Sequence, residues 1–193
     1  MEIKEILERT RHMAVDAGEA LATYGRLPIK VHSYDLVVSR GKRSTKSVIV
    51  RFEVTPIGKE KSEMVKEVID GRGSINAIDS AIARVMSGHF GEDLARCVKP
   101  IAFDVNGDFE NGASGTSVPA RVRVGFRGTL PISLCGSEKM SERVICWHAV
   151  AKDDDTIDAA MRAFVLGYNF WLVVNSPQET YFGNSPSVQE LRS

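Results

Sequence analysis

The first 28 residues of the chain carry apolar side chains at helical spacing. Between residues 2 and 22, apolar residues recur at steps of three and four with charged residues between them, which is typical of an amphipathic helix. Gly25 and Pro28 follow, and both residue types end helices. We therefore predict an N-terminal helix and linker over residues 1–28, and we expect the helix to dock on a partner or on a second copy of the chain.

Beyond this segment, apolar positions alternate with polar ones. A period of two is typical of half-buried strands, and it predicts three strands, at 29–38, 47–56 and 63–70. Gly71 and Gly73 then interrupt the alternation. The residues that follow return to helical spacing, with one apolar stripe made by Ile75, Ile78, Ile82 and Val85. The predicted order is therefore β-β-β-α.

The second half of the chain repeats this order. Strands are predicted at 100–105, 117–126 and 142–151, with a loop over 127–140. An acidic run, Asp153 to Asp155, then leads into an apolar helix, and acidic residues suit the start of a helix. The second unit is again β-β-β-α.

The two predicted helices also begin with similar letters, INAIDSAI and IDAAMRAF. Matching the ends of the preceding strands places Asn76 opposite Asp158. We prefer this register to one shifted by about one helical turn, because it keeps both strand-to-helix turns equal. We predict an α+β domain over 29–174, built from duplicated βββα units (29–90 and 100–174) related by a pseudo-two-fold axis.

Composition narrows the partners and the compartment. The 25 basic residues balance the 25 acidic ones, so we expect no nucleic acid and no membrane partner. No apolar run approaches the roughly 20 residues that span a bilayer, and the N-terminus lacks the apolar core of a signal peptide. We therefore expect a cytoplasmic protein. Residues 175–193 are polar, contain two prolines and show no period, which predicts a mobile tail.

The sequence contains no pattern that assembles an active site. The three cysteines have no CxxC spacing, and we expect Cys146 to be a buried small hydrophobe. The four histidines are dispersed. The segment from Asp104 begins like a calcium loop, but Phe109 and Gly115 stand where such a loop needs glycine and glutamate, so a polar hairpin connection is the better interpretation. We expect no catalytic residue, no metal and no cofactor.

The turn made by Gly71, Arg72 and Gly73 has two interpretations. A dinucleotide fingerprint would need a third glycine where Asn76 stands, and the P-loop lysine is also absent. The glycines then serve either as a plain turn or as a place where free N–H groups at a helix start bind a carboxylate. For a pair of glycines taken alone, the plain turn is favoured.

Two longer motifs resemble one known family. The segment DGRGSINAIDSAIARVM is similar to a helix entry in the C-terminal allosteric domain of the isopropylmalate and citramalate synthases, often called the LeuA dimer domain. The segment CWHAVAKDDDTIDAAMRAFVLGYNFWL resembles the second such element, and AFDV resembles a strand of the same domain. The resemblance covers residues 29 to about 174.

This resemblance implies a regulatory function in branched-chain amino acid biosynthesis. The family domain is a duplicated βββα unit that forms a homodimer and binds the feedback inhibitor, leucine or isoleucine, around its glycine turns and helix starts. A branched side chain would lie between apolar residues, and an aspartate at the second helix start would meet the ammonium group. The matching positions are Gly71, Gly73, Ser74, Ile75, Asn76, Ala77, Phe103, Asp155, Thr156, Ile157 and Asp158.

The chain departs from the family pattern in several places. Ser74 replaces a usual proline, and His148 and Ala151 stand where glycines are common, which would narrow one half of the pocket. The residues before the first strand are too few for the family's catalytic barrel. We therefore expect a regulatory domain that acts on a partner synthase and is not an enzyme. The alternative is a structural or protein-interaction module that kept the fold and lost the ligand.

Overall fold

The computed structural model describes residues 15–22, 24, 26–39, 45–56, 59, 61–71, 73–107, 118–130 and 143–175 of the 193-residue chain. Several predictions fall partly or wholly outside these residues. They include the first part of the N-terminal helix, Arg72 of the glycine turn, the hairpin connection beyond residue 107, the loop beyond residue 130 and the tail from residue 176.

The first half forms a three-stranded antiparallel sheet followed by a helix, as predicted. The strands are β2 (Ile29–Ser39), β3 (Thr45–Val54) and β4 (Glu63–Gly71), with β3 in the middle, and the helix is α3 (Ser74–Phe90). The period of two correctly predicts which side chains face inward on β3, because Val48, Val50 and Phe52 are all buried. We call β2-β3-β4 the first sheet.

A short helix, α4 (Glu92–Arg96), joins this half to the second half. The second half contains β5 (Val98–Gly107), β6 (Ala120–Leu130), β7 (Arg143–Asp153) and the helix α5 (Thr156–Val174). These strands, with β6 between β5 and β7, form the antiparallel part of the second sheet. The element order β-β-β-α therefore occurs twice, while the origin of the two units by duplication stays a prediction.

The predicted loop over 127–140 is wrong at its start, because β6 continues to Leu130. Gly128 suggested a turn, yet it is paired with Ile145 inside the sheet. A side chain at this position would collide with the indole ring of Trp171. The glycine therefore makes room for the aromatic core and does not end the strand.

The predicted N-terminal helix is correct for Ala17–Leu21 and wrong for Val15 and Asp16. Val15 and Asp16 form β1, which pairs in parallel with β7, and only Ala17–Leu21 is helical (α2). The Asp16 carboxylate accepts hydrogen bonds from the N–H groups of Gly18 and Glu19, at 2.7 and 3.3 Å, and so begins the helix at this point. α2 contacts α5 and β7 of its own chain, so this part of the segment belongs to the domain core.

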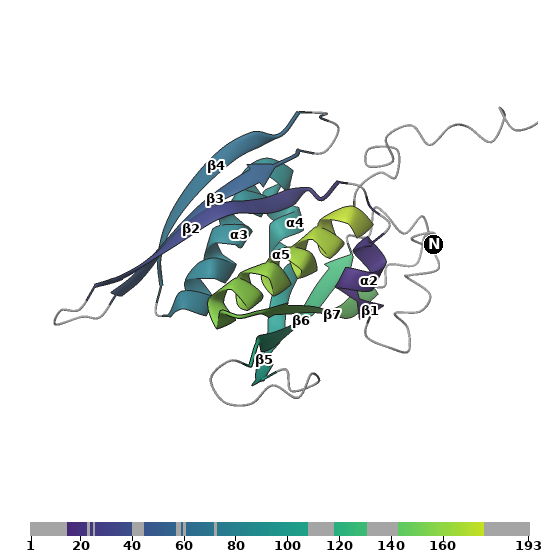
Figure 1. The fold of residues 1–193 in the computed structure, drawn as a ribbon. Helices are drawn as coiled ribbons and strands as arrows, with labels where there is room; N and C mark the ends of the chain where they lie inside the picture. Colours follow the sequence, from purple (N-terminus) through teal and green to yellow (C-terminus); the bar gives the residue numbers. More distant parts are fainter. Residues whose placement is uncertain are drawn as a thin grey trace, which may run out of the picture.

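Helices α3 and α5 lie between the two sheets, as Figure 1 shows. α3 contacts β3 and β4, whereas α5 contacts β6 and β7 and also reaches β2. Stacked aromatic rings fill the space under α5, with centroids 5.6 Å apart for Phe126 and Trp147 and 5.5 Å apart for Trp147 and Trp171. The protein is therefore a mixed α+β fold with one continuous core between two sheets.

The enclosed position of α5 decides how its composition should be interpreted. This 19-residue helix is long and apolar enough to cross a bilayer, with a mean hydropathy of 1.3 over its most apolar window, contrary to our expectation that no such run exists. In the structure 72% of that window is buried inside the protein. The helix is thus accounted for as a core helix, and a cytoplasmic location stays a prediction.

Candidate functional site

The start of α5 is closed by the protein's own carboxylate. Asp155 is the N-cap residue, and its Oδ1 accepts hydrogen bonds from the N–H groups of Ile157 and Asp158, at 2.6 and 3.2 Å. Thr156 is exposed and Ile157 is half-buried. Two N–H groups that we expected to hold a ligand carboxylate are therefore already bonded, and Asp155 acts on the helix itself.

The start of α3 differs because no side chain caps it. Gly73 is the N-cap residue, with an extended backbone (φ −164°) that any residue adopts, and a side chain there would meet nothing within 4 Å. Ser74 and Ala77 are buried, Ile75 is half-buried and Asn76 is exposed. Gly71 ends β4, where it pairs with Lys46. The first turn of α3 therefore has no side-chain cap, and its Ala77 N–H donates to the Gly73 carbonyl in the ordinary way.

The residues that we expected to form one pocket lie in different places. Phe103 stacks on Phe164, with ring centroids 6.2 Å apart, two turns beyond the start of α5. The contact between the helices is also far along α5, where the Tyr168 hydroxyl donates a hydrogen bond to Asp79 at 2.5 Å. Burial raises the pKa of Asp79, while this hydrogen bond lowers it. This hydrogen bond between α3 and α5 therefore does not join the two helix starts.

The predicted obstruction by His148 is wrong. His148 belongs to the outer face of the second sheet, because its neighbours Trp147 and Ala149 point into the core. Its Nε2 lies 3.4 Å from the Asp16 carboxylate, at the edge formed by β1. The imidazole is thus on the far side of the sheet from α5 and cannot narrow a pocket there. Ala151 faces inward and is almost completely buried.

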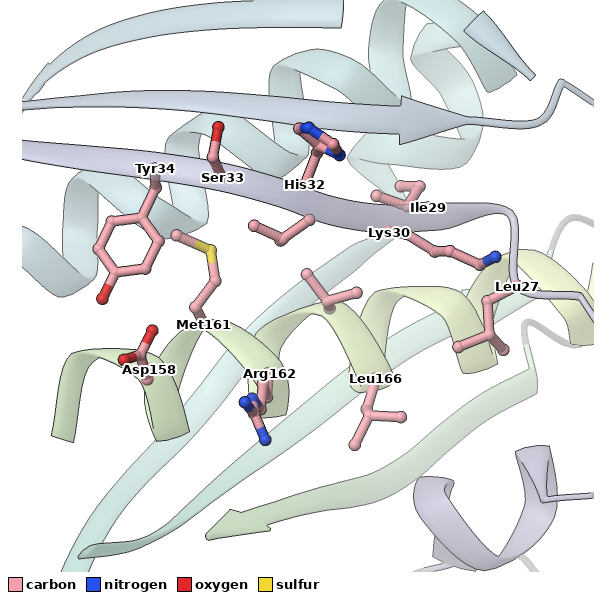
Figure 2. Close-up of a pocket in the computed structure, with 12 residues that line it drawn as sticks. Leu27, Ile29, Lys30, His32, Ser33, Tyr34, Asp158, Met161, Arg162 and Leu166 are labelled. Atoms are coloured by element: carbon pink, nitrogen blue, oxygen red, sulfur yellow. The ribbon is translucent and has the colours of Figure 1, made fainter. Parts of the chain in front are cut away.

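A groove of about 750 Å³ lies between β2 and α5. Figure 2 shows it from the side, with β2 above the helix. Its volume lies within the range of sites that hold small molecules. Of the predicted site residues it contains only Asp158, and its lining comprises Leu27, Ile29, Lys30, Val31, His32, Ser33, Tyr34, Asp158, Met161, Arg162, Val165 and Leu166.

Tyr34 and Asp158 close one end of the groove. Figure 2 shows the Tyr34 ring pointing from β2 toward the Asp158 carboxylate on the first turn of α5. Burial raises the pKa of the Tyr34 hydroxyl, and the hydrogen bond to Asp158 and the charge of that carboxylate raise it further. The hydroxyl therefore stays protonated at neutral pH and acts as a donor to Asp158.

A positive charge lies one helical turn further along α5. Arg162 Nη2 is 3.0 Å from the Asp153 carboxylate, and the arginine side chain is 66% exposed, so a ligand can reach it. Asp158 and Arg162 are four residues apart, which places them on the same side of the helix. Beside them, Met161 and Val165 supply an apolar wall. The groove thus combines a carboxylate, a guanidinium and apolar surface.

Comparison with known proteins does not identify the chain. It matches no protein-family model and no curated protein. The resemblance to the LeuA dimer domain therefore stays a prediction based on the motifs. Among the described residues, no group of three or more His, Cys, Asp or Glu side chains is placed to hold a metal ion.

Sequence reasoning missed this groove because its two walls come from opposite halves of the chain. The sequence pattern predicts a strand near residue 30 and a helix near residue 160, and it says nothing about their contact. The one available signal was the spacing of Asp158 and Arg162 on a helix that is otherwise apolar. Which strand faces that side of the helix depends on the packing of the whole domain.

Proposed function

We propose that the protein is a regulatory domain that binds a small apolar amino acid, leucine or isoleucine, in the groove between β2 and α5. The observation that carries this proposal is the placement of Asp158 and Arg162, one turn apart beside an apolar wall. A free amino acid has the matching features, an ammonium group, a carboxylate and, in these two cases, a branched apolar side chain. The predicted ligand class is kept, and its site moves from a space between the two helix starts to the groove beside the first turns of α5.

In this proposal each group of the ligand has one counterpart. The ammonium group donates to Asp158, and the carboxylate accepts from the Arg162 guanidinium, which is suited to binding both carboxylate oxygens. The side chain packs on Met161 and Val165. All four counterparts lie on α5, and β2 forms the opposite wall of the groove.

Such a ligand can regulate a partner only by stabilising one arrangement of the domain over another. We propose that the partner is a synthase of branched-chain amino acid biosynthesis, as the motif resemblance implies, and that the domain itself has no catalytic residue. The difference in ligand affinity between the two arrangements sets the largest possible effect on the partner.

We further propose that the domain functions as a homodimer through the inner face of β5. This strand lies at the edge of the second sheet, and its inward-facing Phe103 and Val105 remain 41% and 42% exposed. A group of neighbouring exposed apolar side chains often marks a surface that binds another protein. The same surface supports the alternative, a structural or protein-interaction module without a ligand.

The first test is the thermal unfolding of the purified chain with each of the twenty amino acids at millimolar concentration. A ligand present at 100 times its Kd stabilises the folded state by about 2.7 kcal/mol. For a chain of this size each kcal/mol raises Tm by roughly 2–4 °C. We expect leucine or isoleucine to raise Tm by several degrees and charged amino acids to have no effect.

A matched pair of variants locates the site. Asp158→Asn removes the proposed ammonium acceptor and should abolish the shift, whereas Asp154→Asn removes an exposed carboxylate outside the groove and should leave it intact. If no amino acid raises Tm, the sensor proposal fails and the interaction module is favoured. Analytical ultracentrifugation of the same samples tests the homodimer separately.

A further inference from the structure

The strand β2 forms one edge of the first sheet. Among the described residues it pairs with β3 alone, and the groove lies between it and α5 (Figure 1). Leu36 and Val37, near its far end, remain 37% and 48% exposed. An edge strand carries a row of backbone N–H and C=O groups that point away from its sheet, and an extended chain can pair with them. The edge of β2 thus offers main-chain hydrogen bonds beside the groove.

The register shows which residues of β2 turn their backbone groups to this edge. Thr55 N–H donates to Pro28 C=O at 2.8 Å, so these two residues form a hydrogen-bonded pair one step before the β2–β3 ladder. Hydrogen-bonded and non-hydrogen-bonded pairs alternate along an antiparallel ladder. Ile29, the next residue, therefore points its N–H and C=O away from β3. The same alternation, carried across the register shift near His32, assigns outward groups also to Val31, Tyr34 and Leu36.

Asn169 of α5 agrees with this assignment at Ile29. Its side-chain amide accepts a hydrogen bond from Ile29 N–H at 2.9 Å and donates one to Ile29 C=O at 2.7 Å. A residue of a neighbouring antiparallel strand would make the same two bonds. The Asn169 side chain is completely buried, so it occupies the edge at the first residue of β2. An added chain cannot pair past this point, and a segment that ends here fits the edge better than one that continues.

A bulge in β2 has a similar consequence. The register shifts by one residue between Val31 and Ser33, and His32 is the extra residue. Bulges interrupt regular pairing. The regular part of the outward edge therefore runs from Tyr34 toward the end of β2, and it meets the groove where Tyr34 faces Asp158 (Figure 2). An extended chain that pairs with this part enters the groove with its last residues.

The groove contains the groups that suit the C-terminus of a chain. Arg162 contacts the Asp153 carboxylate through Nη2, and a guanidinium has further N–H donors that can bind a second carboxylate. Met161 and Val165 supply apolar surface beside it. A C-terminal residue combines a carboxylate with a side chain and therefore matches this arrangement. A chain that enters at Tyr34 and ends in the groove runs antiparallel to β2.

We propose that β2 and the groove together bind the C-terminal segment of a partner protein as an added antiparallel strand. The main chain of the segment pairs with Tyr34 and Leu36, its terminal carboxylate accepts from Arg162, and its last side chain is apolar and packs on the wall formed by α5. Every second residue of the segment faces α5, because it lies opposite an inward-facing residue of β2. In such complexes the main chain supplies affinity and the pockets supply specificity.

A second copy of β2 fits this edge less well than a chain terminus. The strand β2 lies inside the sequence, so a second copy would continue past both ends of the edge. Asn169 and the bulge at His32 close one of those ends. A terminus has no such continuation, and it also brings the carboxylate that Arg162 can bind.

The docking of a peptide rests on the edge and the groove alone, whereas its regulation rests on the proposed function. Free leucine has the same carboxylate and branched side chain as a C-terminal leucine, so both would use Arg162 and the same apolar wall. Leucine would then displace the segment and control the contact with the partner. A free amino acid has no main chain to pair with β2, and this difference separates the two kinds of ligand.

The probe is fluorescein-labelled Gly-Gly-Val-Thr-Val-Thr-Leu, in which the apolar residues are spaced to face α5. Fluorescence anisotropy with the full chain, up to about 1 mM, measures its Kd. Amidation of the C-terminus should weaken binding by about tenfold or more, because the carboxylate is lost. N-methylation of the second valine, whose N–H points toward β2, should weaken it similarly. N-methylation of the threonine before it, whose N–H points away, should change Kd by less than about threefold.

Two variants and hydrogen exchange locate the contact. Arg162→Gln should weaken binding by about tenfold, whereas Arg84→Gln replaces an arginine of similar exposure on α3, outside the groove, and should leave Kd unchanged. Circular dichroism and thermal melting verify that both variants are folded. The probe should slow exchange of the N–H groups of Tyr34 and Leu36 but not of those in β4, which is the other edge of the same sheet.

Several outcomes would overturn the proposal. They are the absence of binding at about 1 mM by the probe and by the same peptide ending in isoleucine or valine, equal binding of the amidated form or of both N-methylated forms, and protection confined to β4. Exchange at Tyr34 and Leu36 that slows with protein concentration alone would assign the edge to a second copy instead. Peptide binding without any effect of leucine contradicts only the amino-acid proposal, and a rise in Tm with leucine but no peptide binding contradicts only this one.

Discussion

The two halves of the molecule share an order of elements but treat their polar groups differently. In the first half, the outer face of the sheet balances its charges, and α3 begins at Gly73 with no side-chain cap. In the second half, the described residues of the outer face include more cations than carboxylates, and α5 begins at Asp155 with a capping carboxylate. α5 is also almost completely enclosed, whereas α3 has an exposed side.

This difference indicates that the two halves contribute unequally to the stability of the domain. The second half supplies most of the aromatic core, and its helix is secured at the start. The first half relies on α5 for part of its cover, because β2 packs on that helix across the groove. Substitutions made in matched pairs, one in each half, test this view.

The largest effect is expected inside the two helices. Gly167 of α5 lies against the Phe126 ring, and a Cβ there would overlap the ring atoms, while Gly88 of α3 has nothing within 4 Å. Gly167→Ala should cost about 2–3 kcal/mol of unfolding free energy, as overpacked cores do. Gly88→Ala should instead gain up to about 1 kcal/mol from helix propensity. Denaturant melts measure both values, and a neutral Gly167→Ala would contradict the close packing under α5.

A smaller effect is expected at the helix starts. Asp155→Ala removes the bonds to the N–H groups of Ile157 and Asp158 and should cost about 1 kcal/mol. Gly73→Ser adds a capping hydroxyl to α3, whose start has none, and should gain a few tenths of a kcal/mol. The same melts record both changes. If Asp155→Ala costs no stability and Gly73→Ser brings no gain, the two helix starts do not differ in capping.

The smallest effect should depend on pH and concerns the contact between the helices. Burial raises the pKa of Asp79, so the folded state favours its protonated form, and stability is lost as the pH rises from the ordinary value near 4 through the raised one. Asp79→Asn keeps an acceptor for Tyr168 without the charge, and we expect a gain of about 0.5 kcal/mol at pH 7 that disappears below pH 4. Melts at pH 3.5, 5 and 7 measure it. A gain of the same size at all three pH values would mean that the carboxylate charge is irrelevant.

The strands and long helices were predictable because their apolar periods are unambiguous. Two predicted boundaries, the start of a helix and the end of a strand, were wrong for opposite reasons. At Asp16 the helical spacing continues, but the Asp16 to Glu19 spacing is itself a capping signature, and it marks the start of α2 at Ala17. At Gly128 a turn residue lies inside a strand, because Trp171 fills the space beside it. The second failure depends on a ring 43 positions away along the chain, which local pattern cannot supply.

The candidate site was less predictable than the fold. Cys146 is exposed, so the prediction that it is buried is wrong. Its exposure follows from the same period of two that buries Ile145 and Trp147, so the sequence contained that information. The groove did not follow from the sequence in the same way, because it depends on strand register and on which strand lies over α5.

Asn169 has a consequence for the time course of folding. Its buried side chain accepts a hydrogen bond from Ile29 N–H at 2.9 Å and donates one to Ile29 C=O at 2.7 Å, across 140 positions of sequence. The first residue of β2 therefore cannot complete its hydrogen bonds until α5 has been synthesised. Contacts that are distant in sequence form slowly, because the loop entropy must be overcome before the contact stabilises anything. During synthesis, the first half must wait for the last helix before it becomes native.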